Sequence, residues 1–122
     1  MKAYYAHCKS IYNTAQEKRD VEILTSLGFE VVNPSEFDQV KLDERKLKGE
    51  NVMETVFLPE IAACDVVAFR ALPDGSISSG VFAECSECVR LNKPLIELPS
   101  GLCRRALNLE QTREYLTESG QR

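Results

Sequence analysis

The chain has 122 residues and a net charge of −4, with 43% hydrophobic and 28% charged residues. These values are ordinary for a folded water-soluble protein, and we expect one domain over residues 1–122. The acidic balance argues against a nucleic-acid polymer as partner, and no apolar run approaches the ~20 residues of a membrane span.

Hydrophobic periodicity and turn residues divide the chain into alternating strands and helices. The predicted strands cover residues 2–6, 29–32, 65–70 and 93–98. The predicted helices cover residues 14–27, 51–63, 81–91 and about 109–117. Alternation with short connections predicts an α/β fold with a single small doubly wound parallel sheet, Rossmann- or flavodoxin-like, with helices on both faces. The simplest strand order is 2-1-3-4.

Local signals mark the ends of the first helix. Thr14 and Glu17 have the spacing of a capping box, and Gly28 suits the position after the last turn. The buried face of this helix is predicted to hold Val21, Leu24 and Leu27. The sequence therefore predicts a helix packed on the sheet through one apolar stripe.

The middle of the chain is less regular. Residues 35–51 are dense in charge, and we interpret them as a solvated loop with room for one short helix. Pro59 should kink or split the next helix. Pro94 favours a place at or near the sheet edge for the last strand.

The cysteines indicate a cellular compartment and exclude little else. An odd count of five and a strand pattern from the first residues, without a signal peptide, favour a reducing cytoplasm. Cys85 and Cys88 form a CxxC pair, but a zinc site would need a second pair or nearby histidines, and His7 is the only histidine. We interpret the pair as small apolar residues on one helix face, and we expect no metal and no cofactor.

A ligand site is predicted where the strand order reverses between strands 1 and 3. The loops over residues 7–13 and 71–80 should meet there. The first loop matches neither a dinucleotide fingerprint nor a phosphate-binding loop. His7 and Cys8 suggest a thiol nucleophile only weakly, because adjacent strand residues point to opposite faces. For the same reason only one of Tyr4 and Tyr5 can reach the crevice.

The second loop carries the strongest chemical signal. Ser78 and Ser79 offer hydroxyls, and the helix start from Gly80 onward offers unpaired N–H groups that hold a phosphate or keep a carboxylate ionised. Glu84 falls in the first turn of the predicted helix and is a candidate nucleophile or base. The alternative is that Glu84 only interacts with the helix dipole. Asp65 starts its strand, at the end of the sheet away from the crevice, and Asp74 suits a turn.

Three stretches resemble the nucleoside 2-deoxyribosyltransferase family, and most closely the branch that contains the 2′-deoxynucleoside 5′-phosphate N-hydrolases. They are residues 3–6 with the following loop, residues 63–68, and residues 78–84 with the helix and Asn92-Lys-Pro94 that follow. With the element order, the likeness spans residues 2–98. The family's small doubly wound α/β domain agrees with the predicted fold. Phe82 departs from the family, which commonly has a glycine there.

The resemblance implies roles for individual residues. The family's nucleophilic glutamate falls on Glu84, and the tyrosine that orients it falls on Tyr4, with Tyr5 as the alternative. Ser78 stands where the transferases usually carry an aspartate and the nucleotide hydrolases carry a serine that contacts the 5′-phosphate. The expected substrate contacts are Tyr5, His7, Lys9, Ser10, Asp74, Ser78, Ser79 and Gly80. Asp65 and Asp74 are candidate acids for the departing base.

The implied activity is cleavage or transfer of the N-glycosidic bond of a (deoxy)nucleoside or its 5′-monophosphate through a glycosyl ester on Glu84. The family also implies a homo-oligomer, a dimer or larger. One alternative is a non-catalytic nucleotide-binding module, in which Glu84 would bind a ribose hydroxyl. Another is a thiol redox protein that uses Cys85 and Cys88.

Overall fold

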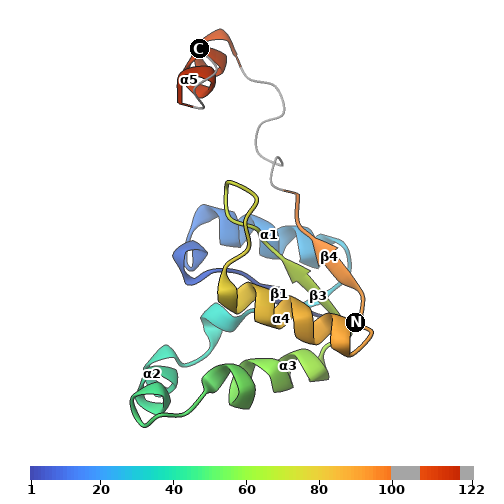
Figure 1. Ribbon diagram of the computed structural model, residues 1–122. Coiled ribbons are helices and arrows are strands. Elements are labelled where there is room, and N and C mark those ends of the chain that lie inside the picture. Colours follow the sequence, from blue (N-terminus) through green and yellow to red (C-terminus); the bar gives the residue numbers. More distant parts are fainter. Residues whose placement is uncertain (100–107, 119–122) are drawn as a thin grey trace.

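Four parallel strands form the centre of the molecule, seen in the computed structural model in Figure 1. The structure describes residues 1–99 and 108–118. The strands are β1 (Lys2–Ala6), β2 (Glu30–Val32), β3 (Val66–Phe69) and β4 (Leu95–Glu97). Their order is β2-β1-β3-β4, so the predicted α/β class, parallel sheet and strand order are confirmed. Within the described residues, no helix combines the length and apolar character needed to cross a bilayer.

Helices cover both faces of this sheet, as predicted. The α-helices are α1 (Ala15–Ser26), α2 (Gln39–Leu47), α3 (Leu58–Ala63), α4 (Ser79–Arg90) and α5 (Leu109–Glu118). Shorter turns are η1 (Lys9–Ile11), η2 (Pro34–Glu36) and the π-helical η3 (Met53–Phe57). Figure 1 shows α1 on one face of the sheet, and α3 and α4 on the other.

β1 is buried on both sides because it lies between two other strands and two helical layers. Tyr4 belongs to the core formed with α3 and α4, where it packs near Val67 and Cys88. Tyr5 belongs to the core on the α1 side, with Leu24 and others. The side chains of Tyr4 and Tyr5 are both inaccessible to solvent. The predicted separation of the two tyrosines onto opposite faces is therefore confirmed.

α1 begins and ends at the predicted capping residues, but fewer of its apolar residues are buried than the sequence predicted. Thr14 accepts a hydrogen bond from the Glu17 N–H at 3.3 Å, and Gly28 has a φ of +92°. Leu24 is buried, whereas Leu27 is 64% exposed, so its predicted burial is wrong. Each three-residue step falls about 60° short of a full turn, which carries Leu27 away from the face that Val21 occupies.

The charge-rich segment contains one short helix, for which its interpretation as a solvated loop left room. α2 is capped by Asp38, whose side chain accepts from the Lys41 N–H at 3.1 Å. Leu42 is buried in a small separate core with Val52 and Phe57. Leu42 is therefore the residue through which this mostly polar helix packs into a core.

Pro59 acts as the sequence predicted. It lies in the first turn of α3, directly after the π-helical turn η3, so the expected helix is split in two. Proline is tolerated at a helix start because its missing N–H would have no partner there. η3 thereby brings Met53 and Phe57 toward the start of α4, where Met53 Cε lies 3.7 Å from the place that a Cβ on Gly80 would occupy.

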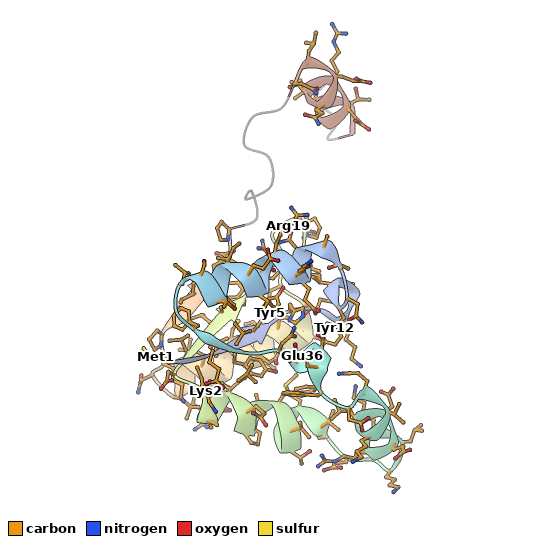
Figure 2. All side chains as sticks on the ribbon, turned by 180° about the vertical axis from the view of Figure 1, so that it is seen from behind. Met1, Lys2, Tyr5, Tyr12, Arg19 and Glu36 are labelled. Carbon is orange, nitrogen blue, oxygen red and sulfur yellow. The ribbon has the colours of Figure 1, made fainter. Side chains whose placement is uncertain are left out.

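A buried ion pair connects α1 to the sheet. Asp20 accepts from Arg70 Nε at 3.0 Å and Nη2 at 2.5 Å, and it also accepts from the Tyr5 hydroxyl at 2.5 Å. Arg70 Nη1 donates to the Pro99 carbonyl at 2.9 Å. Asp20 is fully buried and Arg70 is 5% exposed. Figure 2 shows Tyr5 on the side of the sheet that α1 covers.

Replacing one partner of this pair should destabilise the fold strongly. In Arg70→Met, the Asp20 carboxylate stays buried without its cation, which costs about 3–5 kcal/mol of unfolding free energy. Arg90→Met is the control, because Arg90 pairs with Glu87 and its side chain is 69% exposed, and it should cost about 1 kcal/mol or less. Urea denaturation measures both. Equal losses would contradict a structural role for the buried pair.

Candidate functional site

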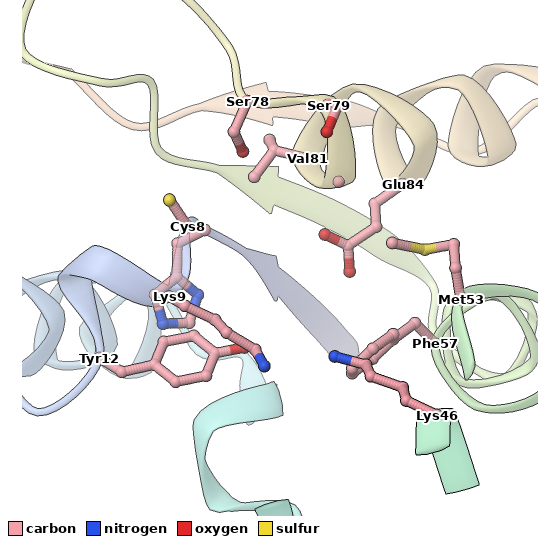
Figure 3. A pocket seen from close by; sticks show the side chains of 12 residues that line it. Cys8, Lys9, Tyr12, Lys46, Met53, Phe57, Ser78, Ser79, Val81 and Glu84 are labelled. Carbon is pink, nitrogen blue, oxygen red and sulfur yellow. The ribbon is translucent and has the colours of Figure 1, made fainter. Parts of the chain in front are cut away.

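A pocket of about 330 Å³ opens at the carboxyl end of β1, against the start of α4. This volume is within the range of small-molecule sites. Its lining residues are His7, Cys8, Lys9, Tyr12, Lys46, Met53, Phe57, Ser78, Ser79, Gly80, Val81 and Glu84. Figure 3 shows the side chains of these residues around the opening. The loop after β1 and the segment before α4 meet here, at the point where the strand order reverses.

Glu84 lies in the wall of this pocket and is almost fully buried, with 6% of its surface exposed. α4 begins at Ser79, earlier than the sequence predicted, so Glu84 lies in the second turn and not the first. Burial raises the pKa of the carboxyl from 4.5 to about 7, although the bond from Tyr4 opposes the rise. Loss of solvent is therefore the main influence on the pKa of this carboxyl, and the hydrogen bond from Tyr4 opposes it.

The Tyr4 hydroxyl fixes the position of the Glu84 carboxylate. Its hydroxyl donates a short hydrogen bond to Glu84 Oε2. Burial, and then the nearby Glu84 charge, raise the pKa of Tyr4, so its hydroxyl keeps its proton. The tyrosine therefore acts as a fixed donor that restricts the rotation of Glu84, and Figure 3 shows the carboxylate directed into the pocket.

His7 is a fixed part of the opposite wall. Its Nδ1 lies 2.9 Å from the Tyr5 carbonyl and its Nε2 lies 2.7 Å from Glu17 Oε2. The ring also stacks on Tyr5, with the centroids 3.7 Å apart. Both ring nitrogens face these partners, so the geometry gives no support to His7 as a base for the Cys8 thiol.

Cys8 and Tyr12 complete this wall. Hydrogen bonds from Ser10, with a further one from Ser78, lower the pKa of the Cys8 thiol. Burial, and then the Glu84 charge, raise the pKa of Tyr12 to about 12. At neutral pH, Tyr12 therefore presents a protonated hydroxyl to the pocket.

The start of α4 can receive an anion. Ser78 is its N-cap residue, and the Ser78 hydroxyl makes no capping bond to the helix. The first N–H groups of a helix have no partners within the helix and carry partial positive charge. Ser78, Ser79 and Gly80 all line the pocket. This edge therefore combines hydroxyl and backbone donors beside Glu84.

The structure brings together seven of the eleven residues that the sequence suggested, Glu84 among them. Tyr4 contacts Glu84, and five suggested substrate contacts line the same pocket. These five are His7, Lys9, Ser78, Ser79 and Gly80. The contact between Tyr4 and Glu84 favours Tyr4 over Tyr5 as the orienting tyrosine.

Four other suggested residues lie elsewhere. Asp65 accepts from the Lys2 N–H at 2.7 Å, at the opposite end of β1. Asp74 accepts from the Ser76 N–H at 2.9 Å within a turn. Tyr5 lies under α1, and Ser10 lines a separate hollow of about 500 Å³ that also includes Arg70. None of the four lines the pocket of Glu84, so the two candidate acids are not positioned to act there.

Several lining residues were not singled out by sequence reasoning. Tyr12 belongs to the predicted first loop, and its place in that loop was a usable signal. No sequence signal pointed to Lys46, because it is one of several lysines in a charged segment. Met53 and Phe57 looked like ordinary apolar positions of a helix. Their approach to the site depends on the π-helical turn before Pro59.

The CxxC pair is part of the core, as expected. Cys88 is fully buried, and Cys85 is 7% exposed. Burial, and then the nearby Glu84 charge, raise the pKa of Cys85 to about 11, which disfavours the reactive thiolate. The interpretation of both cysteines as small apolar core residues is therefore confirmed.

Comparisons with protein-family models, with curated proteins and with solved structures find no match to this chain.

The raised pKa of Glu84 predicts how stability depends on pH. An unfolded carboxyl loses its proton near 4.5 and the folded one near 7, so the folded state binds more protons between these values. Stability should fall as pH rises from about 4.5 to about 7 and then level off. Glu84→Gln should lack this fall and exceed the wild type at pH 8 by up to roughly 3 kcal/mol.

Urea denaturation of both proteins at pH 4, 6 and 8 provides the measurement, since other titrating groups cancel in the difference. At pH 4 the neutral acid and the amide are close in shape and charge, so the two proteins should be nearly equal. A difference that does not change with pH would show that Glu84 has the same pKa in the folded and unfolded states, and would contradict the raised value.

Proposed function

We propose that this pocket cleaves or transfers the N-glycosidic bond of a (deoxy)nucleoside or its 5′-monophosphate. The observation that carries the proposal is the Glu84 carboxylate, buried, held by the Tyr4 hydroxyl and directed into a pocket beside a helix start. A carboxylate so held can attack one defined position of a bound sugar.

In the first step, a Glu84 oxygen forms a bond to C1′ of the sugar. The bond between C1′ and the base nitrogen breaks, and its electron pair leaves with the base. The base nitrogen takes up a proton, and the pocket offers the Tyr12 hydroxyl as a donor. The transition state has oxocarbenium character, so the adjacent carboxylate also stabilises positive charge.

The second step releases the sugar and restores Glu84. In hydrolysis, a water oxygen bonds to C1′ while the ester bond from C1′ to Glu84 breaks, and the water proton passes to solvent. In transfer, the nitrogen of a second base takes the place of water. A pKa of about 7 leaves a large ionised fraction at neutral pH while keeping the carboxylate poorly solvated and reactive.

A 5′-phosphate has a natural place at the start of α4. Ser78 and the N–H groups that follow it offer donors to the phosphate oxygens. The same donors would draw the sugar into the pocket with C1′ toward Glu84. This arrangement supports a nucleotide over a free nucleoside as substrate.

The second candidate is a module that binds a nucleotide without cleaving it. The half-protonated state of Glu84 near neutral pH supports this candidate, because a carboxyl that is only partly ionised can also exchange hydrogen bonds with ribose hydroxyls. Release of free base, scored by chromatography over a panel of nucleosides and nucleotides, separates the two candidates.

Two further expectations remain predictions. One is a cytoplasmic location. The other is a homo-oligomer, for which the exposed side chains of Phe82 and Val89 on α4 provide apolar surface.

Glu84→Gln should abolish base release. The amide keeps the shape of the side chain and can accept the Tyr4 bond, but it cannot act as an anionic nucleophile. Glu87→Gln is the matched control, because Glu87 lies on the same helix and pairs with Arg90 instead of lining the pocket. Turnover is measured by chromatography of the free base. Wild-type turnover in Glu84→Gln would exclude Glu84 as nucleophile, and a sugar adduct on Glu84 with a slow 2-fluorinated substrate would show the ester directly.

Ser78→Asp should remove a preference for phosphate. Wild-type protein should bind a 5′-monophosphate roughly tenfold or more tightly than its nucleoside, a difference of ~1.4 kcal/mol. A carboxylate at position 78 would repel the phosphate, whereas Ser86→Asp adds the same charge at an exposed position outside the pocket and should keep the preference. Calorimetric titration of the matched ligands measures this. Equal affinities in the wild type would reject the phosphate site at α4.

A further inference from the structure

Two lysines from distant parts of the chain meet at one side of the pocket. Lys9 belongs to η1, directly after β1, and Lys46 belongs to the last turn of α2. Both line the pocket, and Figure 3 shows their ammonium ends directed toward one another. Among the described lining residues, Glu84 is the only carboxylate. The pocket is therefore locally positive in a chain whose net charge is −4.

The two like charges are placed where they repel. The nearby Lys9 ammonium is the main reason why the pKa of Lys46 is lowered, and partial loss of solvent adds to the effect. Bringing two cations together without a counter-ion costs electrostatic energy, and a bound anion removes that cost. Paired ammonium groups of this kind are a common way to bind a phosphate or carboxylate.

The position of Lys46 is determined by packing. Leu42, one turn earlier on α2, is buried against Val52 and Phe57, which anchors the helix beside the pocket. The Arg45 guanidinium donates to both Glu50 oxygens at 2.6 Å, and this closes the C-terminal turn of the helix. The lysine therefore belongs to a supported helix and not to a free loop.

The lysine pair is separate from the donors at the start of α4. In Figure 3 the Glu84 carboxylate lies between Ser78 and Ser79 on one side and the two ammonium groups on the other. A phosphate held at Ser78 would lie on the far side of Glu84 from the lysine pair, whose mutual repulsion Asp43 offsets only in part. Two anion-binding edges thus flank one candidate nucleophile.

We propose that Lys9 and Lys46 form a second anionic subsite, which binds a phosphate or carboxylate group carried by the same substrate. This inference rests on the proposed function and narrows it: the preferred substrate is a nucleotide with two anionic groups. The second group is either another phosphate on the sugar or a carboxylate on the base. The open position of the lysines makes their contribution sensitive to salt.

The experiment measures binding in the Glu84→Gln background, where no turnover occurs. One pair of probes is 2′-deoxyuridine 5′-monophosphate against 2′-deoxyuridine 3′,5′-bisphosphate. The other is uridine 5′-monophosphate against orotidine 5′-monophosphate, which adds a carboxylate to the base. In one of these two pairs, the ligand with two anionic groups should bind at least tenfold more tightly than the parent monophosphate. This gain in affinity should shrink as the salt concentration rises.

Adding Lys46→Gln or Lys9→Gln should remove that gain while leaving the Kd of the parent within about twofold. Lys48→Gln is the matched control, because it removes the same charge from the exposed end of α2 at a residue that does not line the pocket, and it should keep the gain. The pair of probes that shows the gain identifies the second group as phosphate or carboxylate.

Three results would overturn the subsite. The first is equal Kd values within both pairs, or no binding of any probe. The second is an equal loss for parent and doubly anionic ligand in Lys46→Gln, which would mean that the lysines hold the single 5′-phosphate. The third is a loss of base release from the parent in an otherwise wild-type Lys46→Gln protein, without any change in Kd, which would assign Lys46 to the leaving base. Base release by wild-type protein tests the proposed function separately, and it can succeed while the subsite fails.

Discussion

The structure depends on one strand that is buried on both faces. Tyr4 and Tyr5 are neighbours on β1, yet each must place its hydroxyl in a different dry layer of the protein. A buried hydroxyl needs a hydrogen-bond partner, and in both layers the partner is a carboxylate from the covering helix. A slip of β1 by one residue would place one tyrosine and one alanine opposite the two carboxylates, so one of the carboxylates would lose its donor.

The two carboxylates differ because only one has a cation beside it. Asp20 is paired with Arg70, so its charge is compensated and it connects α1 to β3 and to the end of β4. Glu84 has the Tyr4 hydroxyl, and its carboxylate lines a pocket. Similar burial thus produces a structural group on one face and a group with a pKa of about 7 on the other. This contrast between the two faces supports a chemical role for Glu84.

The sheet could be predicted from the sequence because alternating strands and helices with short connections leave few topologies. Glu84 could be placed near the crevice for the same reason, since it follows the loop after the third strand. Its position in the helix was off by part of a turn, because Ser79 and Gly80 resemble loop residues but are helical. The sequence therefore placed Glu84 near the crevice but did not reveal how deeply its carboxyl is buried.

Buried charges and the α2 segment could not be predicted in this way. Asp20 looks like a surface residue of an amphipathic helix, and its burial depends on Arg70, fifty positions later in the chain. α2 has one buried residue, Leu42, while Val40 and Leu47 are exposed, so its apolar residues do not form a periodic buried stripe. The partners of both Asp20 and Leu42 are distant in sequence, and only the folded chain brings them together.

α2 also has its own small core, made by Leu42, Val52 and Phe57, apart from the two cores that pack on the sheet. The segment that carries Lys46 is thus joined to the rest of the protein as a nearly independent unit. Substitutions in residues 35–51 can therefore change the wall of the pocket that Lys46 forms without disturbing the contact between Tyr4 and Glu84. Under the proposed function, Glu84 would stay constant while this segment varied, and such an arrangement would let specificity diverge while the chemistry is kept.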